Sequence, residues 1–219
     1  MNRWTACVCG LALSANLTSS AEDLFNGRDL SGWDAVLANP GVGKEAVWSV
    51  RNGLLVCRGE PMGYLYTTRT FTNARIIVEW RWAPGTPPGN SGILLRINGQ
   101  PRPLPRCIEV QLKSGQAGDI YGFHGMRVTG PEDRMVRCPD HPLGGDLTGV
   151  RKAIAAERAP GEWNIAEIEL NGERLRVTIN GQLVNEAWGC EQVPGPIGLQ
   201  SEGGEIHFRT VRLEPLPEQ

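Results

Sequence analysis

The chain has 219 residues, 40% of them hydrophobic, and its 22 Lys and Arg nearly balance its 24 Asp and Glu, for a formal net charge of −2. This length suits one large β domain or two small ones, and the hydrophobic content is sufficient for a core. Because nucleic acids and anionic membranes attract basic proteins, the charge excludes them as expected partners. Seven Trp outnumber four Phe and three Tyr. Trp can stack on sugar rings, but we expect most of the seven in the core.

The first 21 residues have the pattern of an export signal. Arg3 supplies a positive start, residues 4–17 are mainly apolar but too short and interrupted to span a bilayer, and Ser19-Ser20-Ala21 offers small residues for cleavage before Glu22. No later stretch approaches the length of a membrane span. We therefore expect a signal peptide over residues 1–21, a single domain over 22–219, no membrane insertion, and a periplasmic or secreted location.

The rest of the chain predicts short antiparallel strands. Three Asn-Gly pairs, at residues 52–53, 171–172 and 180–181, each separate two apolar runs, and Asn-Gly favours the tight turn of a β-hairpin. Apolar and polar residues alternate in further segments, which we predict as strands: residues 76–82, 91–97, 107–113, 197–201 and 206–213. Many short strands with Gly and Pro between them indicate an all-β sandwich.

Two segments depart from this pattern. Residues 147–158 are rich in Ala and charge, and they are where we expect a short helix. The longer region 123–160 is charged and poor in strand pattern, and a connection of that length is usually functional or disordered. It predicts either a lid over a binding face or a surface insertion.

Four cysteines lie beyond the export signal: Cys57, Cys107, Cys138 and Cys190. In an oxidising compartment they allow three disulfide pairings, and their wide spacing speaks against a zinc site. We expect at least one disulfide, with the loop around Cys138 as a candidate. The alternative for each cysteine is a free, buried thiol.

Strand alternation gives four strands a polar face opposite an apolar one. The polar faces carry these residues: Glu79 and Arg81; Arg96, together with Leu94; Glu109, Gln111 and Lys113; Gln200 and Glu202. If the four strands are neighbours in a curved sheet, their carboxylate, amide and guanidinium groups form a platform suited to the hydroxyls of a sugar. The alternative is the ordinary solvated face of a half-exposed sheet, with ion pairs across the strands.

Several phrases resemble the 3-keto-disaccharide hydrolase domain family. They are Leu24-Phe25-Asn26-Gly27-Arg28-Asp29-Leu30-Ser31-Gly32-Trp33, Asn90-Ser91-Gly92-Ile93 followed by Arg96, Glu109-Val110-Gln111, Gly161-Glu162-Trp163-Asn164, Ile179-Asn180-Gly181, Gly198-Leu199-Gln200 and Phe208-Arg209. The resemblance covers residues 24–216 and implies a concanavalin-like jelly roll of two antiparallel sheets. Two positions depart from the family pattern: Lys113 replaces an Asp, and Ser201-Glu202 replaces a frequent Asp-His.

The resemblance also implies cleavage of glycosides whose sugar ring carries a ketone at carbon 3. The ketone acidifies the proton on carbon 2, so a base can remove it, the leaving group departs from carbon 1, and water adds to the resulting double bond. Such a site needs a base, a group that stabilises the enolate oxygen, and an acid for the leaving group. We assign Glu109 as the base, Arg96 to the enolate oxygen and His124 as the acid or a lid contact.

The remaining site residues are expected to bind substrate. Gln111 and Gln200 would position hydroxyls, Lys113 lies on the same face, and Glu202 and Glu79 are reserves for the carboxylate role. No cofactor is predicted; a divalent cation is possible, but no ligand spacing names a site for it.

Two other functions remain open on the same fold. A direct glycoside hydrolase needs two carboxylates in one groove, and Glu109 with Glu202 supplies them. A carbohydrate-binding module without catalysis is favoured if Trp33, Trp48 or Trp188 lines the groove. A carbohydrate is the expected partner in all three cases.

Overall fold

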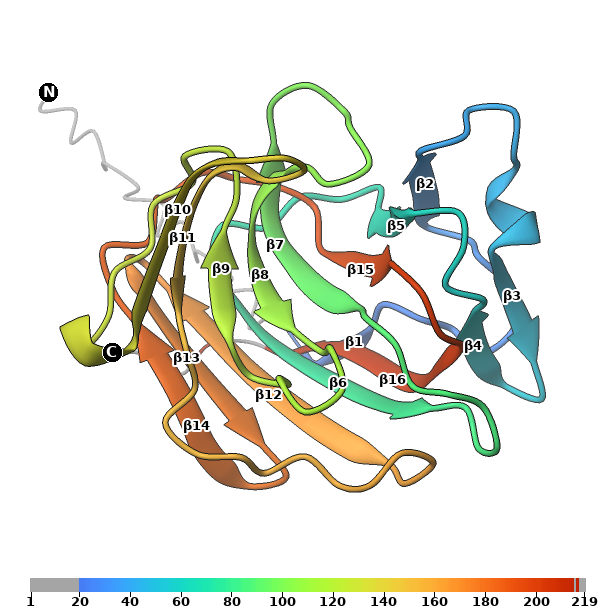
Figure 1. Cartoon of the computed structure of the whole chain (residues 1–219). Coiled ribbons are helices and arrows are strands. Elements are labelled where there is room, and N and C mark those ends of the chain that lie inside the picture. Colours follow the sequence, from blue (N-terminus) through green and yellow to red (C-terminus); the bar gives the residue numbers. More distant parts are fainter. Residues whose placement is uncertain (1–19, 215, 217–219) are drawn as a thin grey trace, which may run out of the picture.

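The computed structural model of the chain describes residues 20–214 and residue 216. Two eight-stranded antiparallel sheets lie one against the other (Figure 1). We call them the groove sheet and the back sheet. The all-β sandwich predicted from the sequence is confirmed.

The groove sheet has the strand order β10-β11-β9-β8-β7-β15-β5-β2. Its strands are β2 (Trp33–Leu37), β5 (Gly63–Thr67), β7 (Gly92–Asn98), β8 (Arg106–Gln111), β9 (Ile120–Gly122), β10 (Met135–His141), β11 (Gly145–Val150) and β15 (Gly198–Ser201). The back sheet has the order β14-β13-β12-β6-β16-β4-β3, with β1 paired to β16. Its strands are β1 (Glu22–Asp23), β3 (Trp48–Arg51), β4 (Leu54–Cys57), β6 (Ala74–Trp82), β12 (Asn164–Asn171), β13 (Arg174–Ile179), β14 (Gln182–Ala187) and β16 (Ile206–Glu214). Two short 3₁₀ turns, η1 (Lys44–Ala46) and η2 (Glu132–Arg134), lie between strands.

The three Asn-Gly pairs form the predicted hairpin turns. They join β3 to β4, β12 to β13 and β13 to β14, and each joined pair is antiparallel. Asn52 and Asn180 adopt positive φ angles of 51° and 50°, and Gly172 one of 56°. Such angles are tolerated by Asn and Gly, which is why these residues mark the turns.

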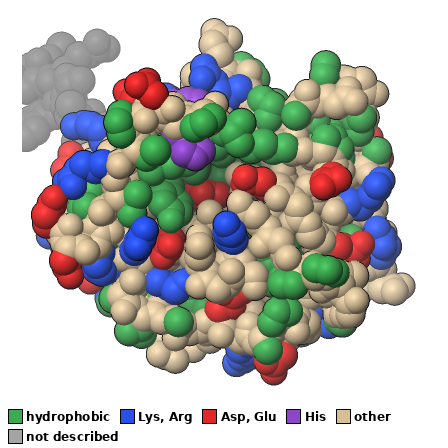
Figure 2. Space-filling model, in the orientation of Figure 1, with side chains coloured by type: hydrophobic (Ala, Val, Ile, Leu, Met, Phe, Trp, Pro, Cys, Tyr) green, Lys and Arg blue, Asp and Glu red, His purple; other side chains and the backbone are tan. Residues whose placement is uncertain are grey.

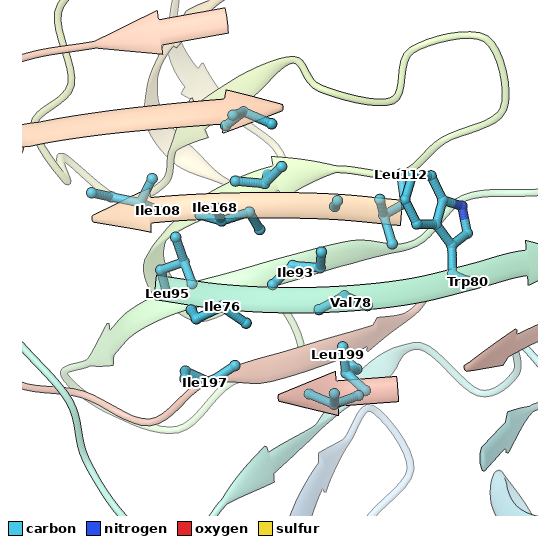
Figure 3. Packing of buried hydrophobic residues seen from close by; sticks show 14 of the residues in the cluster. Ile76, Val78, Trp80, Ile93, Leu95, Ile108, Leu112, Ile168, Ile197 and Leu199 are labelled. Atoms are coloured by element: carbon cyan, nitrogen blue, oxygen red, sulfur yellow. The ribbon is translucent and has the colours of Figure 1, made fainter. Parts of the chain in front are cut away.

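The core lies between the sheets and is built by the predicted alternation. From β6, Ile76, Val78 and Trp80 point toward the groove sheet, and Ile93, Leu95 and Ile108 are among the side chains that meet them (Figure 3). These six side chains are between 0% and 1% exposed. The inner face of each sheet is therefore buried by packing against the other sheet, and only the outer faces are accessible for binding.

The region 123–160 contains a β-hairpin that the sequence did not predict. Strands β10 and β11 form it and extend the groove sheet beyond β9. The predicted helix over residues 147–158 is wrong. Its first residues belong to β11, and the following segment is irregular and bonded to β14 and to the β13–β14 turn, by hydrogen bonds from Ala153 N to Val184 O (2.8 Å) and from Asn180 Nδ2 to Ala156 O (2.8 Å).

The expected disulfide is also absent, because all four cysteines in the described part of the chain are free thiols. Cys107 on β8 and Cys138 on β10 come nearest to sharing a surface, but β9 and β11 lie between their strands. At about 4.8 Å per strand, three spacings separate them by about 14 Å. A disulfide needs Cα atoms within about 7 Å.

The predicted export signal, residues 1–21, falls almost wholly outside the described residues, which begin at residue 20. Within the described part of the chain, no helix is long and apolar enough to cross a membrane.

Candidate functional site

A pocket of about 280 Å³ opens on the outer face of the groove sheet, over β8, β9, β10 and β11. Figure 2 shows acidic side chains inside a hollow on this face, with hydrophobic side chains and a histidine around it. The pocket is lined by Asn90, Leu104, Glu109, Gln111, Lys113, Gln116, Tyr121, Phe123, Val136, Cys138, His141, Leu143, Leu147 and Glu202. Polar side chains from β8 and the segments beside it form one end, and apolar side chains form the other.

Glu109 lies in the polar end, and the neighbouring strand makes room for it. It sits on β8 next to Leu94 of β7, and its side chain is 1% exposed. A Cβ atom at Gly92 would lie 2.0 Å from Glu109 Oε1. Next to that glycine, Ser91 Oγ donates a hydrogen bond to Gln200 O (2.8 Å), which ties the start of β7 to β15. The Asn90-Ser91-Gly92 phrase thus shapes the floor of the pocket.

Glu109 and Glu202 form an acidic pair. Burial raises the pKa of Glu109 well above its usual range, and the nearby charge of Glu202 adds to the rise. Burial also raises the pKa of Glu202, but the side chains of Asn90 and Gln200, the positive charge of Lys113 and the nearby His141 oppose that rise. Because two nearby carboxylates resist ionising together, the pair favours a state in which only one of them is charged.

The amide side chains around the pair are oriented by their other contacts. Gln111 Oε1 accepts hydrogen bonds from the backbone N–H groups of Leu112 (3.0 Å) and Lys113 (2.8 Å), so its Nε2 faces Glu109 Oε2 at 3.5 Å. Among the buried side chains that the structure describes, three acceptor atoms here have no hydrogen-bond partner: Asn90 Oδ1, Glu109 Oε1 and Gln200 Oε1. Buried acceptors without a partner are costly, so the site is suited to a ligand that brings hydroxyl donors.

His141, at the end of β10, is a pocket residue that the sequence reasoning missed. Its Nδ1 accepts hydrogen bonds from the backbone N–H groups of Leu143 (3.3 Å) and Gly144 (3.0 Å). A nitrogen that accepts is unprotonated in the neutral ring, so Nε2 carries the proton and is a donor. The nearest sequence signal was the position of His141 just before the Gly144-Gly145 pair that turns the hairpin.

The other end of the pocket is apolar. Val136, Cys138, Leu143 and Leu147 come from the β10–β11 hairpin, and Leu104 and Phe123 complete this wall. Tyr121 lies between the two ends: its ring stacks on Phe123, with centroids 6.2 Å apart. Its hydroxyl donates to Asp119 Oδ2 at 3.3 Å, and burial raises the pKa of Tyr121 to about 12. The sequence left region 123–160 as a lid or a surface insertion; its β10–β11 hairpin is instead part of the groove sheet and supplies most of this wall.

The structure brings together Glu109, Gln111, Lys113, Gln200 and Glu202, as the platform interpretation requires. It does not bring Arg96 to them. A register shift follows Leu95, and Arg96 takes a positive φ of 53°. Its guanidinium instead donates to the carbonyl oxygens of Thr72 (2.8 Å), Gly172 (2.7 Å) and Glu191 (2.6 Å). The predicted place of Arg96 on the face of Glu109 is wrong.

Glu79 and His124 are also placed elsewhere. Glu79 lies on β6 of the back sheet, where Arg209 donates two hydrogen bonds to its carboxylate at 2.8 and 3.0 Å. His124 lies outside the pocket lining, and both of its ring nitrogens have partners, Leu104 O at 2.9 Å and Arg102 Nη1 at 3.2 Å. The Glu79–Arg209 contact between β6 and β16 is the kind of ion pair across strands that the alternative interpretation of the polar faces described.

Neither the Trp residues nor a metal cluster adds to the site. Trp33 and Trp48 are 2% and 0% exposed in the core, and Trp188, although 45% exposed, is not part of the pocket lining. Across residues 20–214 no three His, Cys, Asp or Glu side chains gather closely enough to hold a metal ion.

Solved structures share the fold at low sequence identity. A candidate glycosyl hydrolase from Parabacteroides distasonis is 21% identical, with a TM-score of 0.65 over 90% of this chain and 94% of that one. A β-glucanase from Bacillus licheniformis is 13% identical, with a TM-score of 0.60 over 91% and 100%. The carbohydrate-binding module CBM66 from Bacillus subtilis is also 13% identical, with a TM-score of 0.55 over 84% and 96%. These likenesses establish the concanavalin-like jelly roll.

No curated protein matches the sequence. The model of the 3-keto-alpha-glucoside-1,2-lyase-like domain, in contrast, matches residues 20–214. Since that match spans most of the 219 residues, the chain belongs to this family, that of the 3-keto-disaccharide hydrolase domain, and is a carbohydrate-active enzyme of the glycoside-cleaving type.

Proposed function

We propose that this protein cleaves 3-keto glycosides by removing the proton on carbon 2, eliminating the group on carbon 1 and hydrating the product. The observation that carries the proposal is the Glu109–Glu202 pair, a buried and a half-buried carboxyl group beside two amide oxygens, of Asn90 and Gln200, that have no partner. A pair that holds one proton has an acid and a base ready at the same time. Elimination needs the base at carbon 2 and the acid at the oxygen on carbon 1, and two neighbouring side chains suit these adjacent positions.

Burial decides which carboxyl keeps the proton. Glu109 is 1% exposed and has only a 3.5 Å contact with Gln111, whereas Glu202 is half-buried, and Asn90, Gln200 and Lys113 oppose the rise in its pKa. We therefore assign the proton to Glu109 and the charge to Glu202. This reverses the sequence-based choice of Glu109 as the base.

In the first half of the reaction, the Glu202 carboxylate takes the proton from carbon 2. The electron pair of that C–H bond forms a double bond between carbons 1 and 2, by way of an enolate on the carbon 3 oxygen. The bond from carbon 1 to the leaving oxygen breaks, and Glu109 gives that oxygen its proton. The products are an unsaturated keto sugar and the free alcohol.

The second half runs through the same two groups in the opposite sense. Glu109, now ionised, takes a proton from water as its oxygen bonds to carbon 1, and Glu202 returns its proton to carbon 2. The net change is glycoside plus water giving a 3-keto sugar plus an alcohol. Both carboxyl groups end in their starting states.

Lys113 and His141 are suited to the enolate oxygen. Both line the pocket, and both lie near Glu202, the group that removes the proton: Lys113 brings a positive charge and His141 its Nε2 donor. They replace Arg96 in the role that the sequence reasoning gave to it. Gln111 and Gln200, with Asn90, are suited to hold the sugar hydroxyls through their amide groups.

The test compares four substrates with wild type, Glu109→Gln and Glu202→Gln: a plain disaccharide, its 3-keto form, and the plain and 3-keto forms of a 4-nitrophenyl glucoside. We expect wild type to cleave only the keto forms. Nitrophenolate leaves without a proton, so Glu109→Gln should retain cleavage of the nitrophenyl keto substrate, whereas Glu202→Gln should lose both keto substrates. Each assay is repeated with EDTA, which tests the possible divalent cation.

The same carboxyl pair also favours a second candidate, a direct glycoside hydrolase, which uses two carboxyl groups around the glycosidic bond. Cleavage of the plain substrates by wild type would establish that candidate and overturn the elimination proposal. Cleavage of neither form by folded protein would leave binding without catalysis as the function.

We further propose that residues 1–21 direct export to the periplasm or the exterior, on the basis of Arg3, the apolar stretch and Ser19-Ser20-Ala21. Cell fractionation and sequencing of the amino terminus of the purified protein test this. A mature chain that begins near Glu22 is expected; an intact Met1 in the cytoplasm would contradict export.

A further inference from the structure

The apolar end of the pocket is too hydrophobic to serve the sugar that the acidic pair would attack. It is formed by Leu104, Phe123, Val136, Cys138, Leu143 and Leu147. Leu143, in the turn between β10 and β11, is 52% exposed and yet lines the pocket, and it is one of four exposed large hydrophobic side chains in the described residues. An exposed apolar side chain at the mouth of a pocket points to an apolar ligand.

The apolar wall is continuous with the acidic pair. Strand register places Glu109 beside Tyr121, Tyr121 beside Gly149, and Gly149 beside Val136, in one row across four strands. A Cβ at Gly149 would lie 2.5 Å from Tyr121 Cδ1, so the Tyr121 ring covers the space that the glycine leaves. A molecule whose reacting bond lies at Glu109 would extend over Tyr121 onto the wall.

We propose that this wall binds the leaving group, and that the enzyme prefers 3-keto glycosides of a small, apolar, single-ring alcohol over those of a second sugar. The inference rests on the proposed function above and names its substrate class. Apart from the Cys138 thiol, whose contact is with Pro139 O at 3.9 Å, the wall's side chains carry no hydrogen-bonding group. Hydroxyls of a second sugar would lose water there and find no partner, whereas an apolar ring would gain from burial.

The size of the pocket agrees with this limit. Its volume of about 280 Å³ is at the lower end for small-molecule sites. It suits one sugar ring and one further ring.

The test uses 3-keto-α-glucosides with three leaving groups: methanol, benzyl alcohol and glucose. Benzyl alcohol is a weaker acid than a sugar hydroxyl, so faster cleavage of the benzyl substrate reports binding and not leaving-group chemistry. We expect kcat/KM to be about tenfold higher for benzyl than for glucose. In the double variant Val136→Thr with Leu143→Asn, kcat/KM for benzyl should fall about tenfold and that for methyl should not change.

Leu183→Asn is the matched control, because Leu183 is a 40% exposed leucine on β14 of the back sheet. It should leave all three substrates unaffected. Equal rates for benzyl and glucose, or a parallel loss of methyl and benzyl cleavage in the double variant, would overturn the inference and leave the proposed function standing.

Failure of the proposed function is recognised separately, by the absence of cleavage of every keto substrate. Binding of benzyl alcohol, followed by saturation-transfer NMR, then still decides the inference. Binding that the double variant loses and Leu183→Asn retains supports an apolar-ring site, and no binding to wild type overturns it.

Discussion

The side chain of Glu109 occupies the space that any side chain at position 92 would need, since a Cβ there would lie within 2.8 Å of the Oε1, Cδ and Cγ atoms of Glu109. We predict that Gly92→Ala moves this carboxyl and lowers kcat/KM about a hundredfold, as small displacements of a reacting group do. In a Glu109→Ala background the same alanine should cost less stability than in wild type, because the clash partner is gone. A double-mutant cycle of urea unfolding measures this coupling. Additive free energies would contradict the contact.

Glu109 should also make the stability of the protein depend on pH. Its pKa in the folded state is raised by burial, so the folded protein binds a proton that the unfolded chain releases above the ordinary glutamate pKa of about 4.3. Stability from this group is complete below that value and is lost as pH rises toward the folded pKa. Glu109→Gln is therefore expected to unfold at a higher temperature than wild type at pH 8 and at the same temperature at pH 4. Thermal unfolding at both pH values measures it, and a gain that is equal at both would refute the raised pKa.

Lys113 is expected to act in the chemical step. If its ammonium stabilises the enolate oxygen, Lys113→Met should reduce kcat about a hundredfold with little change in KM, as loss of one oxyanion donor does. Lys152→Met is the control, since Lys152 Nζ donates to Gly115 O at 2.7 Å and is not part of the pocket lining. A rise in KM at constant kcat would instead mean that Lys113 only binds the ground state.

The sequence predicted part of this site and missed the rest for identifiable reasons. Glu109, Gln111 and Lys113 follow from strict alternation along β8 and the two residues after it, and the other face of β8, Ile108 and Val110, is buried in the core. Arg96 was misplaced because alternation fails where a strand bulges, and nothing in the sequence marks that bulge.

At the scale of elements, Arg96 joins segments that belong to different parts of the fold. Its carbonyl partners lie before β6, at the β12–β13 turn and after β14, whereas Arg96 itself is on β7. Arg96→Lys cannot donate to all of these oxygens at once, and unpaired buried carbonyls cost about 1–3 kcal/mol each. We expect a lower unfolding temperature and an unchanged kcat/KM in the fraction that remains folded. A loss of kcat without a loss of stability would restore Arg96 to a catalytic role.

The pairing of strands explains why Glu79 was grouped with Glu109. Both lie on strands with one apolar and one polar face, and period-2 alternation reads the same in either sheet of a sandwich. Only the pairing of β6 with β12 and β16 assigns Glu79 to the back sheet. The β10–β11 hairpin was missed for a different reason, because Pro139 and several glycines interrupt its apolar pattern. Since the hairpin was missed, His141 and most of the apolar wall were missed as well.

At the scale of the molecule, the three Asn-Gly turns and the alternating strands were enough to predict a two-sheet sandwich. The pocket, in contrast, combines side chains from distant parts of the chain, from Asn90 to Glu202, and needs the strand order to be known. Packing of one face of each sheet against the other leaves the outer face of the groove sheet as the surface on which these side chains meet.

The distribution of thiols over the whole molecule gives the last prediction. Cys57, Cys107 and Cys190 are buried, and burial raises their pKa values, to about 12 for Cys57 and about 11 for Cys190. Cys138 is partly exposed and lines the pocket. Since a thiolate must be accessible to react, iodoacetamide should modify native protein over residues 22–219 once, at Cys138, and unfolded protein four times.

Mass spectrometry of intact protein and of its peptides counts these labels. Because Cys138 belongs to the pocket wall, benzyl alcohol or a 3-keto benzyl glucoside should slow its labelling, whereas glucose should not. Dithiothreitol should leave the unfolding temperature unchanged, since no disulfide joins the four cysteines. A fall in that temperature, or fewer than four labels on protein unfolded without reductant, would reveal a disulfide and contradict the four free thiols.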